Sequence, residues 1–255
     1  MATIEGSAFD DFLIGTRFSD VVHAGAGDDF VKAGNGDDTV FGEDGDDIIF
    51  GDNGDDFLSG GKGDDVLFGG NGDDALLGGE GDDFLSGGKG DDVLTGGAGD
   101  DLLTGGAGDD VLRGGIGDDV LLGGKGDDVL QGGEGSDILQ GGAGDDILQG
   151  GAGDDLLFGG AGDDILSGGA GDDVFAFNGG GGNDVVLDFE AGHDMLQIAN
   201  GINGTDIGSA EDVAARATTV GGNAVIDLGN GDTLTIVGVT AEDLQADPNS
   251  YFTIA

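Results

Sequence analysis

Hydrophobic residues recur every nine positions along more than two thirds of this chain. From Gly6 to Ala176 the sequence divides into 19 consecutive nonapeptides without an insertion, and it settles into units such as GGKGDDVLF and GGNGDDALL. A twentieth copy, GGGGNDVVL, occupies residues 179–187, and a degraded copy, FEAGHDMLQ, follows at 189–197. Counted from the first residue of each unit, position eight is Val, Ile, Leu or Phe in all twenty copies. This register predicts a repeat architecture in which every unit adds one apolar side chain to a common core.

The composition of the unit predicts a turn followed by a strand. The four Gly-rich positions can adopt positive φ without a Cβ penalty, which favours a turn. Positions seven to nine are long enough for a short strand, with position eight facing inward and positions seven and nine facing outward. Two units then form one coil, with a strand and a turn on each side, so twenty units form about ten coils. At ~4.8 Å between stacked strands, the stack would be roughly 45–50 Å long.

Aspartate occupies position six in all twenty copies, and position five in all but three, Ser19, Ser136 and Asn183. In the stacked coils the position-six carboxylates of every second unit lie one strand spacing apart. Two carboxylates ~4–5 Å apart repel each other by about 1 kcal/mol in water and by more when partly desolvated. The core adds only two large side chains per coil, too few to offset the roughly 1–2 kcal/mol of backbone entropy that each ordered residue loses. Another stabilising interaction is therefore required.

A hard divalent cation between the turns would supply that interaction. Calcium takes six to eight oxygen ligands at ~2.3–2.6 Å, and a Gly-rich turn exposes carbonyl oxygens beside each carboxylate, whereas magnesium suits such a site less well. Twenty units give up to 18 sandwiched Ca²⁺ ions, one for each pair of successive turns on the same edge. Their charge of +36 would reduce the formal charge of −47 to about −11.

The charge, the cysteine content and the apolar runs of the sequence exclude several classes of function. Only 7 Lys and Arg residues stand against 54 Asp and Glu residues, which excludes a nucleic-acid binder and disfavours anionic membrane surfaces. The absence of cysteine excludes disulfides and thiolate metal sites. The start, MATIEGSAF, has no conventional signal peptide, and no apolar run reaches the ~20 residues of a membrane helix. His23 and His193 lie too far apart in sequence for a zinc motif, and Lys62, Lys89, Lys125 and Arg216 are expected to be surface charges.

These nonapeptides resemble the G-G-x-G-x-D-x-U-x repeat of the RTX (repeats-in-toxin) calcium-binding family over residues 6–187. The resemblance implies an all-β fold, a right-handed parallel β-roll in which Ca²⁺ is held between turns by the position-six aspartates and turn carbonyls. Phe9 and Phe18 replace the fourth glycine in the first two copies, so Asp11 and Asp20 are left out of the ligand set; Ala24 and Ala33 are milder departures. The ligands carried over are Asp29, Asp38, Asp47, Asp56, Asp65, Asp74, Asp83, Asp92, Asp101, Asp110, Asp119, Asp128, Asp137, Asp146, Asp155, Asp164, Asp173 and Asp184.

Residues 188–255 resemble the C-terminal region of the same secreted proteins. Ser209 and Asp212 form a capping box for a helix over about 210–217, AVIDL and TLTIV flank a hairpin turn at 229–231, and Tyr251–Ile254 would form a last strand. In the family this region caps the roll and carries an uncleaved signal for type I export from Gram-negative bacteria. The expected organisation is an N-terminal cap with degenerate repeats (1–23), a calcium-binding roll (24–187) and a C-terminal cap with the secretion signal (188–255).

Two questions stay open at the level of the sequence. Position-five aspartates are expected to cap their own turns in solvent rather than bind calcium. Position seven is apolar in all but Thr39 although it faces outward, which fits either strand propensity or self-association through an outer face.

The predicted function is a secreted, calcium-binding structural or surface-interaction module, and the alternative is a small pore-forming or signalling RTX protein that acts on membranes. The expected partners are calcium, the type I secretion apparatus and a second copy of the chain. An enzyme is not expected, because in RTX proteases, lipases and toxins the active domain precedes the repeats, and only five residues precede them in this sequence.

Overall fold

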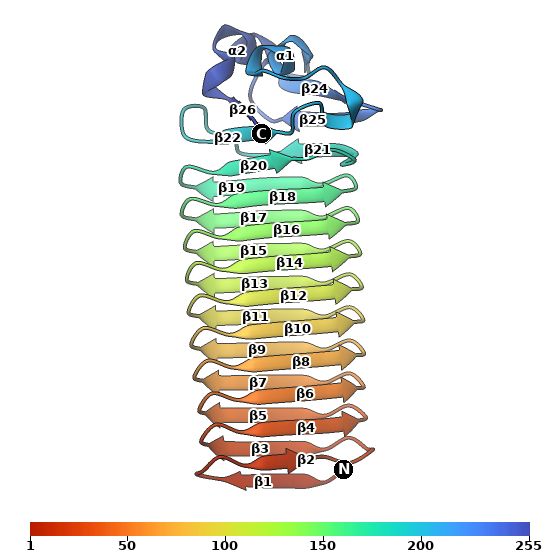
Figure 1. Ribbon diagram of the computed structural model, residues 1–255, viewed down its shortest axis with the longest axis vertical. Helices are drawn as coiled ribbons and strands as arrows, with labels where there is room; N and C mark the ends of the chain where they lie inside the picture. The colour runs from red at the N-terminus through yellow and green to blue at the C-terminus, as the bar shows by residue number, and fades with distance from the viewer.

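The computed structural model describes all 255 residues and consists of two long parallel β-sheets stacked face to face (Figure 1). Successive strands alternate between the two sheets, so each pair of strands forms one coil of a β-solenoid. The solenoid has about eleven turns, one more than the repeat count predicted, because β1 begins before the first repeat and β22 begins in the degraded copy at 189–197. The all-β parallel roll is confirmed.

The first sheet contains the odd-numbered strands of the roll: β1 (Thr3–Ser7), β3 (Val21–Ala26), β5 (Thr39–Asp44), β7 (Phe57–Lys62), β9 (Ala75–Glu80), β11 (Val93–Ala98), β13 (Val111–Ile116), β15 (Val129–Glu134), β17 (Ile147–Ala152), β19 (Ile165–Ala170) and β21 (Asn183–Val186). The second sheet contains the even-numbered strands: β2 (Phe12–Ile14), β4 (Phe30–Asn35), β6 (Ile48–Asn53), β8 (Val66–Asn71), β10 (Phe84–Lys89), β12 (Leu102–Ala107), β14 (Val120–Lys125), β16 (Ile138–Ala143), β18 (Leu156–Ala161), β20 (Val174–Phe177) and β22 (Met195–Ile198).

The regular strands are six residues long, twice the predicted length. Strand β11 pairs in register with β13 at Val93↔Val111 and continues through the glycines at Gly97↔Gly115. The prediction was wrong because it assigned all four Gly-rich positions to the turn. Only positions two and four have positive φ, for example Gly97 at 130° and Gly99 at 133°, so the ladder continues through position three before the chain reverses.

The core is a ladder of position-eight side chains between the two sheets. From Val22 to Val186 these side chains are at most 1% exposed, and leucine fills most of the places. Each coil adds two large apolar side chains, as predicted, and the position-seven and position-nine side chains lie outside.

The C-terminal segment covers one end of the roll (Figure 1). Strands β23 (Ala217–Val220), β24 (Asn223–Gly229) and β25 (Asp232–Ile236) extend the first sheet, with β25 parallel to β21, while β26 (Phe252–Ile254) extends the second. The hairpin and the last strand are confirmed. The helices α1 (Ala210–Ala215) and α2 (Ala241–Ala246) and the 3-10 turns η1 (Ile202–Gly204) and η2 (Pro248–Ser250) complete this cap.

Both helices of the cap begin at a residue whose side-chain hydroxyl caps the first turn. The Ser209 hydroxyl accepts the Asp212 N–H at 3.2 Å, but Asp212 Oδ2 accepts the N–H of Gly208 at 3.1 Å, so only half of the predicted capping box forms, and α1 ends two residues earlier than expected. The sequence reading missed α2, but its sequence signal is the same, and here Thr240 and Asp243 form a reciprocal capping box.

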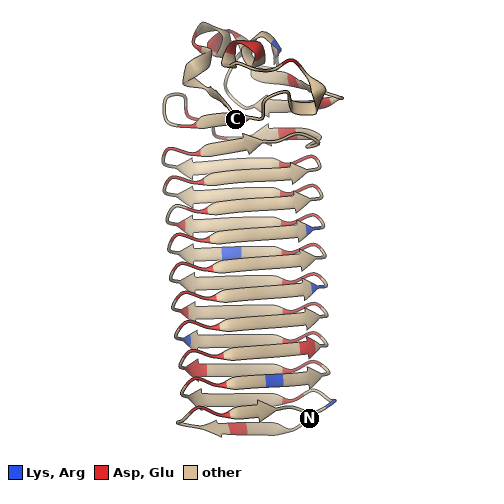
Figure 2. Ribbon diagram, viewed as in Figure 1, with Lys and Arg blue, Asp and Glu red and all other residues tan.

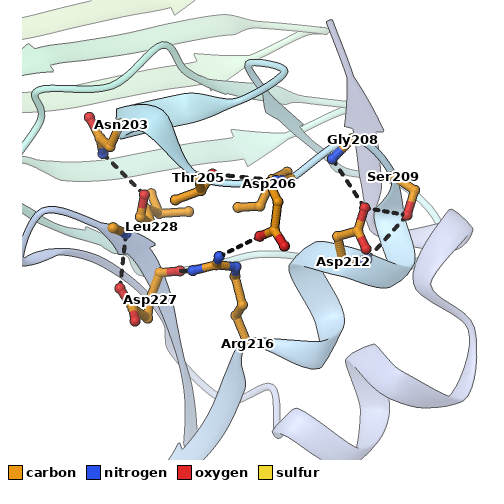
Figure 3. Close-up of polar contacts among 11 residues, drawn as sticks. Asn203, Thr205, Asp206, Gly208, Ser209, Asp212, Arg216, Asp227 and Leu228 are labelled. Atoms are coloured by element: carbon orange, nitrogen blue, oxygen red, sulfur yellow. Dashed lines mark hydrogen bonds and ion pairs between the residues drawn. The ribbon is translucent and has the colours of Figure 1, made fainter.

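A polar network holds the cap together (Figure 3). Arg216 donates to Asp206 Oδ1 at 2.8 Å and to the Asp227 carbonyl at 3.4 Å, so this side chain joins α1 to the hairpin and is not the simple surface charge that was predicted. Asn203 adopts positive φ (54°) and donates to the Leu228 carbonyl at 3.2 Å.

Candidate metal centre along the turns

The structure buries the position-six carboxylates at the two turn edges of the roll. All eighteen aspartates predicted as ligands, from Asp29 to Asp184, are at most 4% exposed. Figure 2 shows the acidic residues in rows along these edges, with very few basic residues among them. Buried carboxylates need either a proton, a cation or hydrogen-bond donors, because desolvation penalises the charged form.

Each position-six carboxylate reaches back to the preceding coil with one oxygen. Asp101 Oδ1 accepts the main-chain N–H of Asp83 at 2.8 Å, and Asp119 Oδ1 accepts that of Asp101 at the same distance. The side chains therefore form a hydrogen-bonded ladder between residues 18 positions apart. The ladder brings the carboxylates of successive coils together, as the repeat predicted.

The second oxygen of the same carboxylates has no partner. In all seventeen position-six aspartates from Asp29 to Asp173, Oδ2 is buried and accepts no hydrogen bond. An unpaired buried donor or acceptor costs about 1–3 kcal/mol, and more for a charged group. Such a series of orphaned oxygens fits a bound cation at each turn, because a cation satisfies a buried carboxylate where no donor is present.

Beside several of the orphaned Oδ2 atoms lies a second oxygen, a main-chain carbonyl of the next coil. A Cβ atom built on Gly123 would lie against Asp128 Oδ2 and 2.6 Å from the carbonyl oxygen of Gly141 in the next coil. Position one is glycine from Gly42 to Gly168, so the space between the two oxygens contains no side chain; in the repeats of Asp29 and Asp38 a methyl group of Ala24 or Ala33 stands there. Nowhere do three His, Asp or Glu side chains form a metal cluster. A cation here would take much of its coordination from carbonyl oxygens, which calcium accepts.

The turns near the ends of the roll satisfy their carboxylates differently. Asp20 Oδ2 accepts the Thr16 N–H at 2.7 Å, Asp11 Oδ2 accepts the Ser7 N–H at 2.6 Å, and Asp194 Oδ2 accepts the Glu190 N–H at 2.7 Å. Thr16 and Ser7 occupy position two without positive φ.

In the regular turns position two has positive φ, even where it is not glycine, as at Glu43 (85°) and Asp52 (76°). In the turns where position two has positive φ, Oδ2 of the position-six aspartate has no hydrogen-bond partner. This conformation therefore distinguishes the turns with an orphaned carboxylate oxygen from the end turns of Asp11 and Asp20.

Burial dominates the ionisation of the ladder. Desolvation, with a smaller contribution from neighbouring carboxylates, raises the pKa of Asp101 and of Asp119 to about 7, although the main-chain N–H donors oppose the shift. The pKa of Asp47, nearer the N-terminal end, rises to about 6 for the same reasons. A bound divalent cation would reverse this tendency by stabilising the ionised form.

The position-five aspartates are exposed but do not cap their own turns. Asp100 Oδ1 accepts the N–H of Asp118 in the following coil at 2.9 Å, and Asp82 Oδ1 accepts that of Asp100. The prediction that these side chains cap their own turns is therefore wrong. Each stacked turn offers the carboxylate a main-chain N–H from the following coil instead. In the regular repeats, the first Asp of the pair accepts a main-chain N–H from the following coil, and the second accepts one from the preceding coil.

The two histidines lie outside this ladder. His193 Nδ1 is 2.8 Å from Asp172 Oδ1, a contact that raises the pKa of this histidine, and His23 Nδ1 is 3.2 Å from Glu43 Oε1. Each has one carboxylate neighbour, as expected of surface residues. Lys62, Lys89 and Lys125 are exposed.

The regular spacing of these turns matches one family. Seven overlapping segments match the RTX calcium-binding nonapeptide repeat, at residues 5–40, 25–58, 41–76, 50–85, 77–112, 113–148 and 140–175. They cover residues 5–175 without a gap. The chain belongs to the RTX calcium-binding repeat family. Repeats of this family bind Ca²⁺, which agrees with the donor set described above.

One solved structure of a longer protein is similar to part of this chain. Among solved structures, the extracellular lipase LipA from Serratia marcescens is similar, with 23% sequence identity and a TM-score of 0.45. The alignment covers 72% of this RTX chain and 40% of the lipase chain, so the chain spans less than half of the lipase. No curated protein matches the sequence.

Proposed function

We propose that this RTX protein is a secreted module that folds when it binds calcium outside the cell, and that the folded roll acts as a structural or surface-interaction element. The observation that carries the proposal is the series of seventeen buried carboxylate oxygens without a hydrogen-bond partner. Several of them lie near a carbonyl oxygen of the next coil, as at Asp128 and Gly141.

The same oxygens explain why folding would depend on the ion. Without a cation, the roll must bury two rows of carboxylates, and it must either protonate them or hold their charges against each other. The core contributes only two large side chains per coil, so its burial contributes too little free energy to offset the cost of burying the carboxylates. Ion binding then supplies folding free energy directly, as in other small metal-dependent domains.

A calcium-dependent fold is suited to export. Submicromolar calcium inside a cell would leave the chain unfolded, and millimolar calcium outside would fold it, if the midpoint lies between roughly 10⁻⁵ and 10⁻³ M. In this proposal residues 188–255 cap the roll and carry the type I export signal. No part of the proposal requires catalysis. None of the helices combines the length and the apolar character needed to cross a bilayer.

The proposal is tested by counting bound ions. Equilibrium dialysis of the whole chain against calcium, with native mass spectrometry of the loaded form, should give many ions per chain, up to about the seventeen turns whose Oδ2 has no hydrogen-bond partner. Magnesium at the same concentration should neither fold the chain nor fill the sites. A loaded chain with only one or two ions would contradict the proposal.

A further inference from the structure

The two ends of the roll differ in how they are covered. At the C-terminal end β23 to β26 and two helices lie over the last coil (Figure 1). At the N-terminal end β1 and β2 are the outermost strands of their sheets, and each pairs on one side only, with β3 and with β4. Open edges of this kind present unpaired main-chain groups to any strand that fits them.

The residues around this open end are unusually apolar for an exposed surface. Phe9 is 78% exposed, Phe12 67%, Ile14 59% and Phe18 57%. They come from the first two repeats, where phenylalanine replaces the fourth glycine of the turn. Solenoids commonly end in a polar capping repeat, and large apolar patches on exposed surfaces usually mark contacts.

The open end also carries less unbalanced charge than the rest of the roll. Residues 1–23 contain four acidic side chains and Arg17, against a formal charge of −47 for the whole chain. Asp11 and Asp20 satisfy their Oδ2 atoms with main-chain N–H groups, so these end turns do not depend on a cation. Two copies can therefore approach through this end with less repulsion than through the acidic turn edges.

We propose that the N-terminal end of the roll is a docking surface for the same end of a second copy of this chain. A two-fold axis would place β1 against β1 of the partner copy and β2 against the partner's β2, so that each sheet continues across the interface. A two-fold contact uses the N-terminal edges of both copies, so the arrangement closes as a dimer instead of growing into a fibre, although β23 and β26 remain the outer strands at the far end. The exposed phenylalanines around the edge would become buried.

The first test is the mass of the calcium-loaded chain by sedimentation at about 50 μM, after circular dichroism has shown that each variant is folded. The unmodified chain should be a dimer, and the F9D/F18D variant should dissociate more than about ten-fold more readily, because it places charge in the interface. I116D is the matched control, since Ile116 is 58% exposed at the end of strand β13, far from the N-terminal end of the roll, and it should remain a dimer. A folded, unmodified chain that is only monomeric would overturn the proposal, as would equal dissociation of I116D.

The second test measures which surfaces meet. The chain has no cysteine, so Ser7→Cys and Ala152→Cys can each carry a single spin label. Docking through the N-terminal ends places the two labels at position 7 within about 30 Å, and those at position 152 more than about 70 Å apart, at ~4.8 Å per coil. The V93T/V111T/V129T variant, which removes apolar area from an outer face, should leave the dimer unchanged. Loss of the dimer in that variant, or close labels at position 152, would assign the interface to an outer face and overturn the proposal.

Discussion

The main-chain N–H of Asp83 donates to Oδ1 of Asp101 at 2.8 Å, and this one contact shows how the turns of the roll are joined. It engages one oxygen of a buried carboxylate and leaves Oδ2 of the same group without a donor. The neighbouring pair is joined in the opposite sense, because the N–H of Asp100 donates to Asp82 Oδ1 at 2.9 Å. Position six therefore combines a structural hydrogen bond with a buried oxygen that has no partner, whereas the position-five side chain is exposed.

The two roles of Asp101 can be separated by substitution. Asp101→Asn keeps an oxygen that can accept the Asp83 N–H but removes the charge and the free carboxylate oxygen. We expect this variant to raise the calcium midpoint of folding several-fold, while it makes the metal-free roll less unfavourable because no charge is buried. Asp101→Ala should raise the midpoint further, because it also loses the hydrogen bond. Calcium titrations followed by far-UV circular dichroism measure both effects.

The matched control is Asp100→Ala. Its side chain is exposed and makes one hydrogen bond to the next coil, so we expect a loss of only about 1 kcal/mol and a nearly unchanged calcium midpoint. If Asp100→Ala and Asp101→Ala shift the midpoint equally, then the assignment of the ligand role to position six is wrong.

The end turns should not contribute to the ion count. Asp20 Oδ2 accepts the Thr16 N–H, whereas Asp128 Oδ2 is orphaned. Native mass spectrometry of the calcium-loaded chain should therefore show fewer ions for Asp128→Asn and an unchanged number for Asp20→Asn. A decrease caused by Asp20→Asn would mean that its turn also rearranges to hold an ion.

The metal-free chain should respond to pH in a definite direction. Burial raises the pKa of Asp56, Asp92 and Asp155 to about 7 in the folded roll, against an ordinary value of 3.8. A group with a raised folded-state pKa favours folding while it is protonated, and this contribution is lost as the pH rises through the folded-state pKa.

Without calcium, β structure should therefore increase as the pH falls from 8 to 5, which stays above the sequence pI of about 4.1. With calcium the roll should persist at pH 8, and its calcium midpoint should rise on acidification, because protons and Ca²⁺ compete for the same oxygens. Circular dichroism of dialysed, metal-free protein measures the first effect. A metal-free chain that loses β structure on acidification would contradict this account.

The C-terminal cap should depend on Arg216. Arg216→Gln removes the ion pair with Asp206 and weakens the contact with the Asp227 carbonyl, so we expect the cap to lose about 1 kcal/mol. Arg113→Gln is the control, because Arg113 lies on the outer face of β13 and donates only to Gln131. Hydrogen exchange of the calcium-loaded chain should show faster exchange in α1 and β24 for Arg216→Gln alone. Equal exchange in the two variants would show that Arg216 does not stabilise the cap.

The sequence predicted the coil, the inward position eight and the rows of carboxylates, because a nine-residue period with fixed Gly, Asp and Leu positions allows one repeating contact pattern. It did not predict the six-residue strands, because glycine permits both a turn and an extended conformation. It also gave no sign of the direction of the hydrogen bonds from Asp100 and Asp101, which depends on the orientation of peptide groups in the next coil. The irregular cap was predicted only where a local signal exists, and contacts such as Arg216 with Asp206 are set by packing.

The central claim is that calcium ions complete the turns and thereby fold the chain. The most direct measurement is far-UV circular dichroism of the metal-free chain at pH 7.5 during a calcium titration, followed by addition of excess chelator. The account predicts a disordered spectrum at the start, a cooperative change to β structure with a midpoint between roughly 10⁻⁵ and 10⁻³ M, and full reversal by the chelator. A β-rich spectrum that persists in excess chelator at this pH would contradict it.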